Sequence, residues 1–154
     1  MLEPLVKTIE VPCDQRTAFN VFVQDMGSWW PLGKFTISAM SGAPATGLRV
    51  ESKKGGEIVE LGPDGAEYHW GRFLEYDPHD FLSMDFHITT PDRPRGDGSL
   101  VEVRFTPLAE DRTRVELTQS RWEVFGDLAQ SVYGGYGHGW DMIFGQAYKA
   151  ACGG

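Results

Sequence analysis

The sequence predicts an α+β domain in which an antiparallel sheet is covered by a C-terminal helix. Between residues 48 and 122, apolar and polar residues alternate within short segments, and turn-forming residues separate one segment from the next. This pattern is typical of antiparallel strands with one face in water. After residue 130 the apolar residues recur at helical spacing, and such a helix can cover the apolar face of the sheet. The 154 residues fit one domain, 1–154.

The N-terminal segment predicts a strand, a helix and a packed corner. Residues 5–11 alternate in polarity and end at Pro12. Asp14 suits a helix N-cap, and four apolar residues follow it on one helical face: Phe19, Phe22, Val23 and Met26. Gly27 is the expected C-terminal stop of this helix. In Trp29-Trp30-Pro31, the proline stops a helix and the two indoles are costly to leave in water, so the segment predicts a corner that packs inward.

The middle of the chain predicts about six strands. They are the segments 48–51, 57–61, 67–77, 81–89, 101–105 and 113–122. Lys53-Lys54-Gly55-Gly56 and Gly62-Pro63-Asp64-Gly65 are the clearest turns between them. Short turns between successive strands favour antiparallel pairing.

The last segment changes to helical period. Its apolar stripe consists of Tyr133, Tyr136, Trp140, Ile143, Phe144 and Ala147. Five glycines interrupt it, and each costs about 1 kcal/mol relative to alanine inside a helix. Either tertiary packing compensates, or the regular helix begins only near Tyr136. A curved sheet that closes around this helix leaves a space between them, which aromatic side chains would line.

The composition argues against several partners. The formal net charge is −8, and an acidic surface repels phosphate backbones, so we expect no nucleic-acid partner. No run approaches the ~18 apolar residues of a membrane span, and the N-terminus resembles no signal peptide. We therefore expect a cytoplasmic protein that does not insert into membranes.

Metal and cofactor sites have no support in the sequence. Cys13 and Cys152 lie near opposite ends of the chain, outside any CxxC or Cys/His cluster, and a disulfide between them stays open. The four histidines show no ligand spacing either. We expect no metal and no cofactor, and the catalytic residues, if any exist, stay unknown.

Four segments carry a family resemblance: "AFNVFVQDMGSWWPLGKFTI", "GGEIVEL…DGAEYHWGRFLEYDP", "VEVRFTPL…RTRVELTQSRW" and "YGHGWDMIFGQAY". Taken in this order, from about residue 6 to residue 150, they resemble the Hsp90-ATPase-activator-like branch of the START-like, Bet v 1-like superfamily. The resemblance implies a helix-grip fold. In that fold a seven-stranded curved antiparallel sheet wraps a long C-terminal helix, and two short helices follow the first strand.

The resemblance also implies an internal cavity for apolar or amphipathic small molecules. The superfamily includes lipid carriers, polyketide cyclases and aromatases, and an Hsp90 co-chaperone domain, and fold alone does not choose among them. Relatives often carry a histidine and a glycine near the end of the last strand, where this chain has Gln119 and Arg121. An acid–base role for that histidine therefore does not carry over.

Arg121 is the sharpest candidate for a binding residue. Gln119 and Arg121 share a strand face with Val115 and Leu117, so a regular strand would direct both toward the cavity mouth. A guanidinium there could bind a carboxylate in bidentate fashion. If the strand bulges before Trp122, Arg121 instead reaches solvent.

Aromatic and aliphatic side chains make up most of the expected cavity lining. The predicted lining residues are Trp30, Phe35, Trp70, Phe73, Met84, Phe86, Val103, Phe105, Leu117, Gln119, Arg121, Tyr133, Tyr136, Trp140, Ile143 and Phe144. For the tryptophans the alternative is plain core packing, and for the hydroxyls of Tyr133 and Tyr136 it is a hydrogen bond to the backbone.

Three functions remain open from the sequence. The first hypothesis is binding of an apolar small molecule or lipid in the cavity, for sequestration or delivery. The alternatives are a cyclase- or aromatase-like enzyme that uses the same cavity and an Hsp90-activator-like protein-binding module. No residue pattern marks a convincing catalytic constellation, so whether the protein is an enzyme stays open, as does its oligomeric state.

Overall fold

The computed structural model describes residues 2–87 and 98–154. In these ranges the strands form one antiparallel sheet with the neighbour order β1-β7-β6-β5-β4-β3-β2. The strands are β1 (Leu5–Val11), β2 (Gly47–Val50), β3 (Glu57–Leu61), β4 (Glu67–Asp77), β5 (Phe81–Phe86), β6 (Ser99–Ala109) and β7 (Arg112–Ser120). The helices are α1 (Gln15–Gln24), α2 (Met26–Trp29), α3 (Ile37–Met40), the 3-10 helix η1 (Trp122–Leu128), α4 (Ala129–Met142), the π-helical η2 (Ile143–Tyr148) and α5 (Lys149–Ala151).

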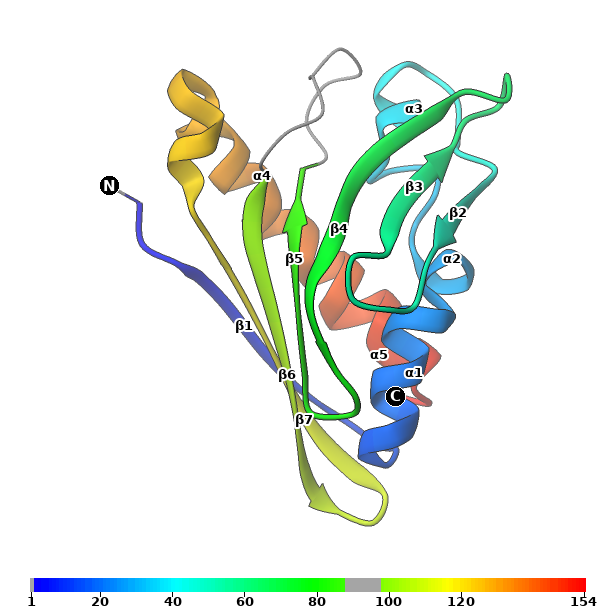
Figure 1. The fold of residues 1–154 in the computed structure, drawn as a ribbon, viewed down its shortest axis with the longest axis vertical. Coiled ribbons are helices and arrows are strands. Elements are labelled where there is room, and N and C mark those ends of the chain that lie inside the picture. Colours follow the sequence, from blue (N-terminus) through cyan, green and yellow to red (C-terminus); the bar gives the residue numbers. More distant parts are fainter. Residues whose placement is uncertain (1, 88–97) are drawn as a thin grey trace.

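The C-terminal helical region lies across the curved sheet. In Figure 1 it runs diagonally behind the strands, from η1 in gold to α5 in red, while α1 lies at the opposite end from η1. Helix α1 packs against β6 and β7, and α2 packs against β2. This is the helix-grip arrangement, so the predicted fold class is confirmed.

Apolar residues pair across the strands on the inner face of the sheet. Leu82 lies opposite Val103, which in turn lies opposite Leu117. Met84 lies opposite Val101 in the same register. All of these side chains are buried. Such cross-strand pairs stabilise a sheet and fix its register, because a shift by one residue would turn each of them to the other face.

The outer face of β5 differs from the prediction. The alternation in residues 81–89 puts Ser83, Asp85 and His87 on the face opposite Leu82, Met84 and Phe86. That is the face that a sheet with one side in water leaves exposed, but all three residues are buried. A carboxylate oxygen of Asp85 lies 3.3 Å from Nε of Arg72 on β4, which gives the buried acid a cation. The period of the strand was therefore predicted correctly, whereas the exposure of its polar face was not.

Two boundaries fall elsewhere than predicted. Gly27 does not end the first helix, because the chain bends at Asp25 and a further turn, α2, runs through Gly27. The last strand ends at Ser120, because Arg121 adopts a left-handed conformation with φ of 64° that cannot continue a strand. Residues 88 and 89, which the prediction placed in a strand, lie outside the described residues.

The glycine-rich helix is regular well before Tyr136. Helix α4 begins at Ala129 and runs through Gly134, Gly135 and Gly137 without a break. Glycine is unfavourable in a helix, so the packing of α4 against η1, β1 and η2 supplies the missing stability. Of the two alternatives that the sequence left open, compensation by tertiary packing is the correct one.

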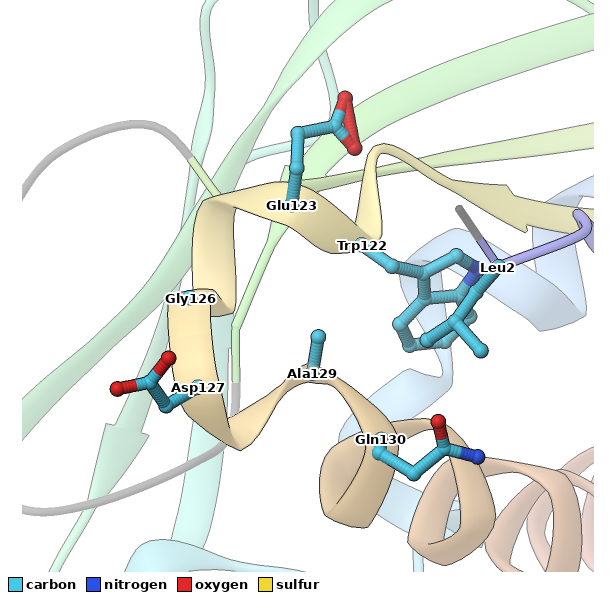
Figure 2. A pocket seen from close by; sticks show the side chains of 7 residues that line it. All are labelled: Leu2, Trp122, Glu123, Gly126, Asp127, Ala129 and Gln130. Carbon is cyan, nitrogen blue, oxygen red and sulfur yellow. The ribbon is translucent and has the colours of Figure 1, made fainter.

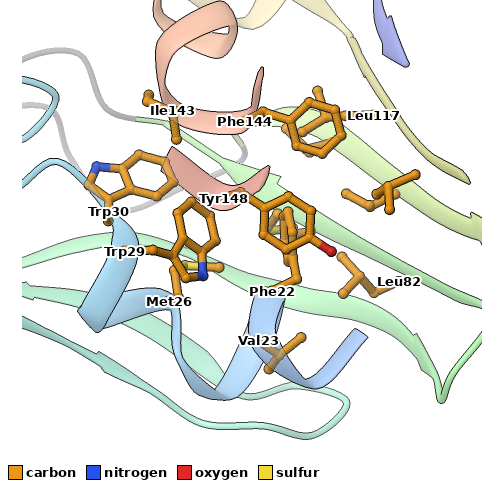
Figure 3. Close-up of a cluster of buried hydrophobic side chains, with 14 of the residues drawn as sticks. Phe22, Val23, Met26, Trp29, Trp30, Leu82, Leu117, Ile143, Phe144 and Tyr148 are labelled. Carbon is orange, nitrogen blue, oxygen red and sulfur yellow. The ribbon is translucent and has the colours of Figure 1, made fainter. Parts of the chain in front are cut away.

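A cluster of rings fills the end of the core next to α1. Figure 3 shows side chains from α1, α2, β5, β7 and η2 in one group, with Phe22, Trp29 and Tyr148 at its centre. The ring of Tyr148 lies 5.3 Å from the rings of Phe22 and of Trp29. Its hydroxyl donates to the carbonyl of Ala18 at 2.7 Å, so the one polar atom of this buried ring is hydrogen-bonded.

A buried carboxylate joins the sheet to α3. Glu60 on β3 is fully buried, and its oxygens accept from the backbone N–H groups of Ile37 and Ser38, each at 2.7 Å. They also accept from the hydroxyl of Ser38 and from Nε1 of Trp70 on β4. A carboxylate offers about four acceptor sites, and all of them are used here.

We expect replacement of Glu60 by glutamine to destabilise the protein strongly. The amide NH2 would face N–H donors and leave at least one buried donor without an acceptor. The expected loss is about 3 kcal/mol in the free energy of unfolding, measured by urea denaturation. Glu67→Gln, at an exposed carboxylate on β4, is the matched control and should change little. Equal urea midpoints for the two variants would show that Glu60 is not an anchor.

Both cysteines lie near α5 and carry free thiols. Burial raises the pKa of Cys152 to about 12. Burial also raises the pKa of Cys13. A hydrogen bond with the neighbouring thiol of Cys152 lowers this pKa, but by less than burial raises it. Because the thiolate is the reactive form, both side chains are poor nucleophiles near neutral pH.

The native protein should therefore react slowly with a disulfide reagent such as dithiobis-nitrobenzoate at pH 8. Two equivalents should react quickly once the chain is unfolded in guanidinium, which serves as the internal control. Raising the pH of the native protein toward 10 should speed the reaction at Cys13 first, because that residue is the more exposed of the two. Fast release of two equivalents at pH 8 without denaturant would contradict the burial argument.

Candidate functional site

A pocket opens between α4 and the segment that runs from Trp30 to Met40. Its volume is about 510 Å³, within the range of roughly 300–1,000 Å³ that is usual for small-molecule sites. The lining residues are Trp30, Lys34, Phe35, Met40, Leu128, Ser131, Val132, Gly135, Tyr136, His138, Gly139 and Ile143. None of the described residues in this lining belongs to a strand, so the pocket lies beside α4 rather than between α4 and the sheet.

Packed rings fill the space behind the pocket. Trp30 lies 4.8 Å from the ring of Trp70 and 6.0 Å from the ring of Trp140, as measured between centroids. Tyr136 stacks on Trp140 at 6.1 Å with an interplanar angle of 19°. Nε1 of Trp30 donates to the carbonyl of Phe35 at 2.8 Å, which fixes the orientation of the indole. The pocket therefore has a rigid aromatic wall.

Two glycines of α4 give the pocket its depth. A Cβ added at Gly135 would meet no atom within 4 Å, so the pocket reaches the bare helix backbone there. A Cβ at Gly139 would touch the ring of Phe35 at 3.7 Å, which marks the narrow end of the hollow. The glycines that weaken the isolated helix are thus the residues that leave room beside it.

Exposed apolar side chains mark the mouth. Met40 on α3 is 54% exposed and Leu128 at the end of η1 is 53% exposed. Among the described residues, the remaining large apolar side chain of comparable exposure is Val6, which lies outside the pocket. Apolar groups that stay in water around a hollow are typical of a binding site.

Four of the predicted cavity residues line this pocket. They are Trp30, Phe35, Tyr136 and Ile143. The structure places nine others in the buried core behind or beside it: Trp70, Phe73, Met84, Phe86, Val103, Phe105, Leu117, Trp140 and Phe144. These nine side chains are packed in the core, which for Trp70 and Trp140 is the alternative that the sequence left open.

Gln119 is held within the protein. Its carbonyl oxygen accepts from Nε1 of Trp140 at 2.7 Å, and its amide nitrogen donates to the hydroxyl of Ser99 at 2.8 Å. The Ser99 hydroxyl in turn donates to the carbonyl of Phe86 at 2.7 Å. All three side chains are buried, so this chain of hydrogen bonds attaches α4 to β6 and β7 rather than facing a ligand.

Arg121 and Tyr133 also lie away from this pocket. Arg121 is exposed, because its left-handed backbone ends the strand that was expected to direct it inward. Tyr133 packs edge-on against Trp122, with 4.9 Å between the ring centroids.

A second hollow of about 520 Å³ lies at the start of α4. Figure 2 shows Trp122 and Leu2 on one side of it and the turn of η1, with Glu123 and Asp127, on the other. Nε1 of Trp122 is buried and has no hydrogen-bond partner among the described residues. The acidic side chains give this hollow a charge opposite to that of the first pocket, where Lys34 is the charged residue.

The sequence prediction missed most of the mouth of the first pocket. Lys34, Met40, Leu128 and His138 line it without having been predicted. The signal that could have revealed it was the glycine run of α4, which the sequence analysis treated only as a cost in stability.

Within residues 2–87 and 98–154, no group of three His, Cys, Asp or Glu side chains could hold a metal ion. In the same ranges, no helix has the length and hydrophobicity needed to span a bilayer.

A helix-grip fold with a pocket beside its C-terminal helix defines the class of this protein. Residues 16–148 match the family model described as activator of Hsp90 ATPase homolog 1-like protein, and the chain belongs to that family. A comparison with curated protein sequences gives no match.

Solved structures agree with this assignment. The chain is similar to Txn09, an anthrahydroquino-gamma-pyrone synthase solved as a complex, with 30% identity, coverage of 86% of this chain and 85% of that one, and a TM-score of 0.61. It is also similar to CalC, a self-sacrificing resistance protein from Micromonospora echinospora, with 25% identity, 97% and 93% coverage and a TM-score of 0.70. An Hsp90 activator from Plasmodium falciparum, 20% identical over 92% of this chain and 96% of that one, has a TM-score of 0.52 and shows the shared fold alone.

The hydrogen bond between Trp140 and Gln119 can be tested by a double-mutant cycle. Trp140→Phe removes the indole N–H and leaves the buried Gln119 carbonyl without its donor, so we expect a loss of about 2–3 kcal/mol in the free energy of unfolding. Gln119→Met should cost less in the Trp140→Phe background than in the wild type, because the unpaired polar group then disappears. Strictly additive costs would mean that the two side chains do not depend on each other.

Proposed function

We propose that the protein binds an apolar or amphipathic small molecule in the pocket between α4 and the segment from Trp30 to Met40. The observation that carries this proposal is the combination of a rigid aromatic wall with two exposed apolar side chains at the mouth. Met40 and Leu128 remain in water when the pocket is empty, and a ligand would cover them. The work of the protein would be sequestration or delivery in the cytoplasm.

The size of the pocket is compatible with useful affinity. Burial of ~500 Å² of apolar surface, ligand and pocket together, contributes about 12 kcal/mol. Loss of the translational and rotational freedom of the ligand costs at least about 4 kcal/mol. The remainder corresponds to a dissociation constant on the order of micromolar.

The similar synthase supports an aromatic ligand as the first class to examine. The name of that synthase denotes a compound with fused rings, and flat rings match the indole of Trp30 and the phenyl ring of Phe35 in the wall of the pocket. Stacked or edge-on contacts between such rings add to the binding free energy that burial of apolar surface contributes.

A cyclase-like enzyme is the second candidate, and the same synthase favours it. In that case Tyr136 and His138 would be the proton-transferring groups of the lining. An Hsp90-activator role, which the family name suggests, is the third. Stimulation of Hsp90 ATPase activity by this chain, unaffected by substitutions in the pocket, would favour that third function over ligand binding.

A larger side chain at a glycine of α4 can reduce the space in the pocket. Gly135→Leu places a side chain in space where a Cβ meets no atom within 4 Å. We expect the wild type to bind the neutral fluorescent probe N-phenyl-1-naphthylamine with a micromolar dissociation constant, and Gly135→Leu to weaken this binding at least about tenfold. Fluorescence titration measures both.

Gly134→Leu is the matched control. Gly134 belongs to the same helix and also has open space at its Cβ, but it does not line the pocket. Both variants gain the same helix propensity, so a difference between them reports the pocket alone. Binding of the probe to Gly135→Leu with wild-type affinity would remove this pocket as the site.

A further inference from the structure

We propose that the pocket selects aromatic ligands that carry one negative charge, and that Lys34 binds this charge. The inference rests on the proposed function, because it names the ligand class of the same pocket. It assigns a specificity role to a residue at the mouth rather than to the aromatic wall.

The charge of the lining is the first argument. The chain has 22 Asp and Glu residues against 14 Lys and Arg, yet no carboxylate is found among the described residues that line the pocket. These residues include one lysine, Lys34, and one histidine, His138. In a protein whose acidic residues outnumber its basic ones, this local reversal leaves the mouth of the pocket favourable to an anion.

The state of the Lys34 ammonium group is the second argument. Some of the other basic side chains have acidic partners: Lys7 pairs with Asp141 at 2.7 Å, Arg49 with Glu67 at 3.0 Å, and Arg112 with Glu10 at 3.7 Å. Among the described residues Lys34 has no such acidic partner. Its backbone N–H donates to the carbonyl of Pro31 at 3.2 Å, which holds the residue in the turn beside the pocket. The side chain is exposed and can move toward a ligand.

The position of Lys34 indicates where the charged group of the ligand lies relative to its aromatic part. Lys34 adjoins Phe35 in sequence, and the Trp30 indole is tied to the Phe35 carbonyl. An aromatic body lying against Trp30 and Tyr136 would therefore present a substituent at the mouth, within the range of the long lysine side chain. His138 belongs to α4, which forms the opposite wall of the pocket. Its imidazole N–H can donate to the same anion.

The second hollow supplies a contrast within the same molecule. It has a similar volume and also contains an aromatic residue, Trp122, but its charged residues are Glu123 and Asp127. An anionic ring compound would be repelled there and attracted to Lys34. Charge therefore determines which of the two hollows such a ligand occupies.

Two probes that differ by one charged group test the inference. The compound 1-anilinonaphthalene-8-sulfonate is N-phenyl-1-naphthylamine with an added sulfonate. We expect the wild type to bind the sulfonate about three- to tenfold more tightly than the neutral probe at low salt. This preference should shrink at 0.5 M salt, because ions screen exposed charges.

Lys34→Gln should abolish the preference and leave the affinity for the neutral probe within about twofold of wild type. Lys54→Gln, at an exposed lysine in the turn between β2 and β3, is the control and should keep the preference. Equal affinity of the wild type for the two probes would overturn the inference, as would an equal loss for both in Lys34→Gln. Preferential displacement by laurate, rather than by anthraquinone-2-carboxylate, would overturn the assignment of an aromatic body.

These outcomes are separate from those of the proposed function. Failure of Gly135→Leu to weaken the neutral probe removes the pocket as a binding site. Loss of charge discrimination in Lys34→Gln concerns the ligand class alone, since the neutral probe still reports an intact pocket.

Discussion

The buried carboxylate of Glu60 is the contact on which the arrangement around the pocket depends. It lies on β3, receives the indole N–H of Trp70 from β4 and binds two successive backbone N–H groups at the start of α3. A short helix such as α3 has little stability of its own, so this contact holds it in place. A buried carboxylate needs several donors, and α3 supplies three of the four that it has.

The aromatic wall follows from that anchor. Trp70, held by Glu60, packs on Trp30, and Trp30 packs on Trp140 of α4. The indole N–H of Trp140 donates to Gln119, and the amide of Gln119 donates in turn to the hydroxyl of Ser99. Two buried polar contacts thus position three indoles, and apolar packing fills the volume between them. The pocket is the space beside this assembly that α4, with its glycines, leaves empty.

Much of the fold could be predicted from the sequence, because each strand carries its own alternation and its own turn. The bounds of the strand at 67–77 and the cap at Asp14 depend only on neighbouring residues, and both agree with the structure. The polar partners could not be predicted in this way. Gln119 and Trp140 lie 21 residues apart in the chain, and their contact depends on how α4 crosses β7. For Arg121 the sequence left two orientations open, and the structure has the exposed one, because a left-handed backbone ends the strand.

The bare backbone of α4 has a consequence for how this protein could diversify. At Gly135 an added Cβ meets nothing within 4 Å, and at Gly139 an added Cβ meets Phe35 only at contact distance. Each of these positions can accept added atoms without displacement of the core, and each accepted atom changes the outline that a guest molecule encounters. A small number of substitutions along one helix would therefore suffice to redirect the protein to a different compound. Such changes would also raise helix propensity, so selectivity and stability need not be in conflict here.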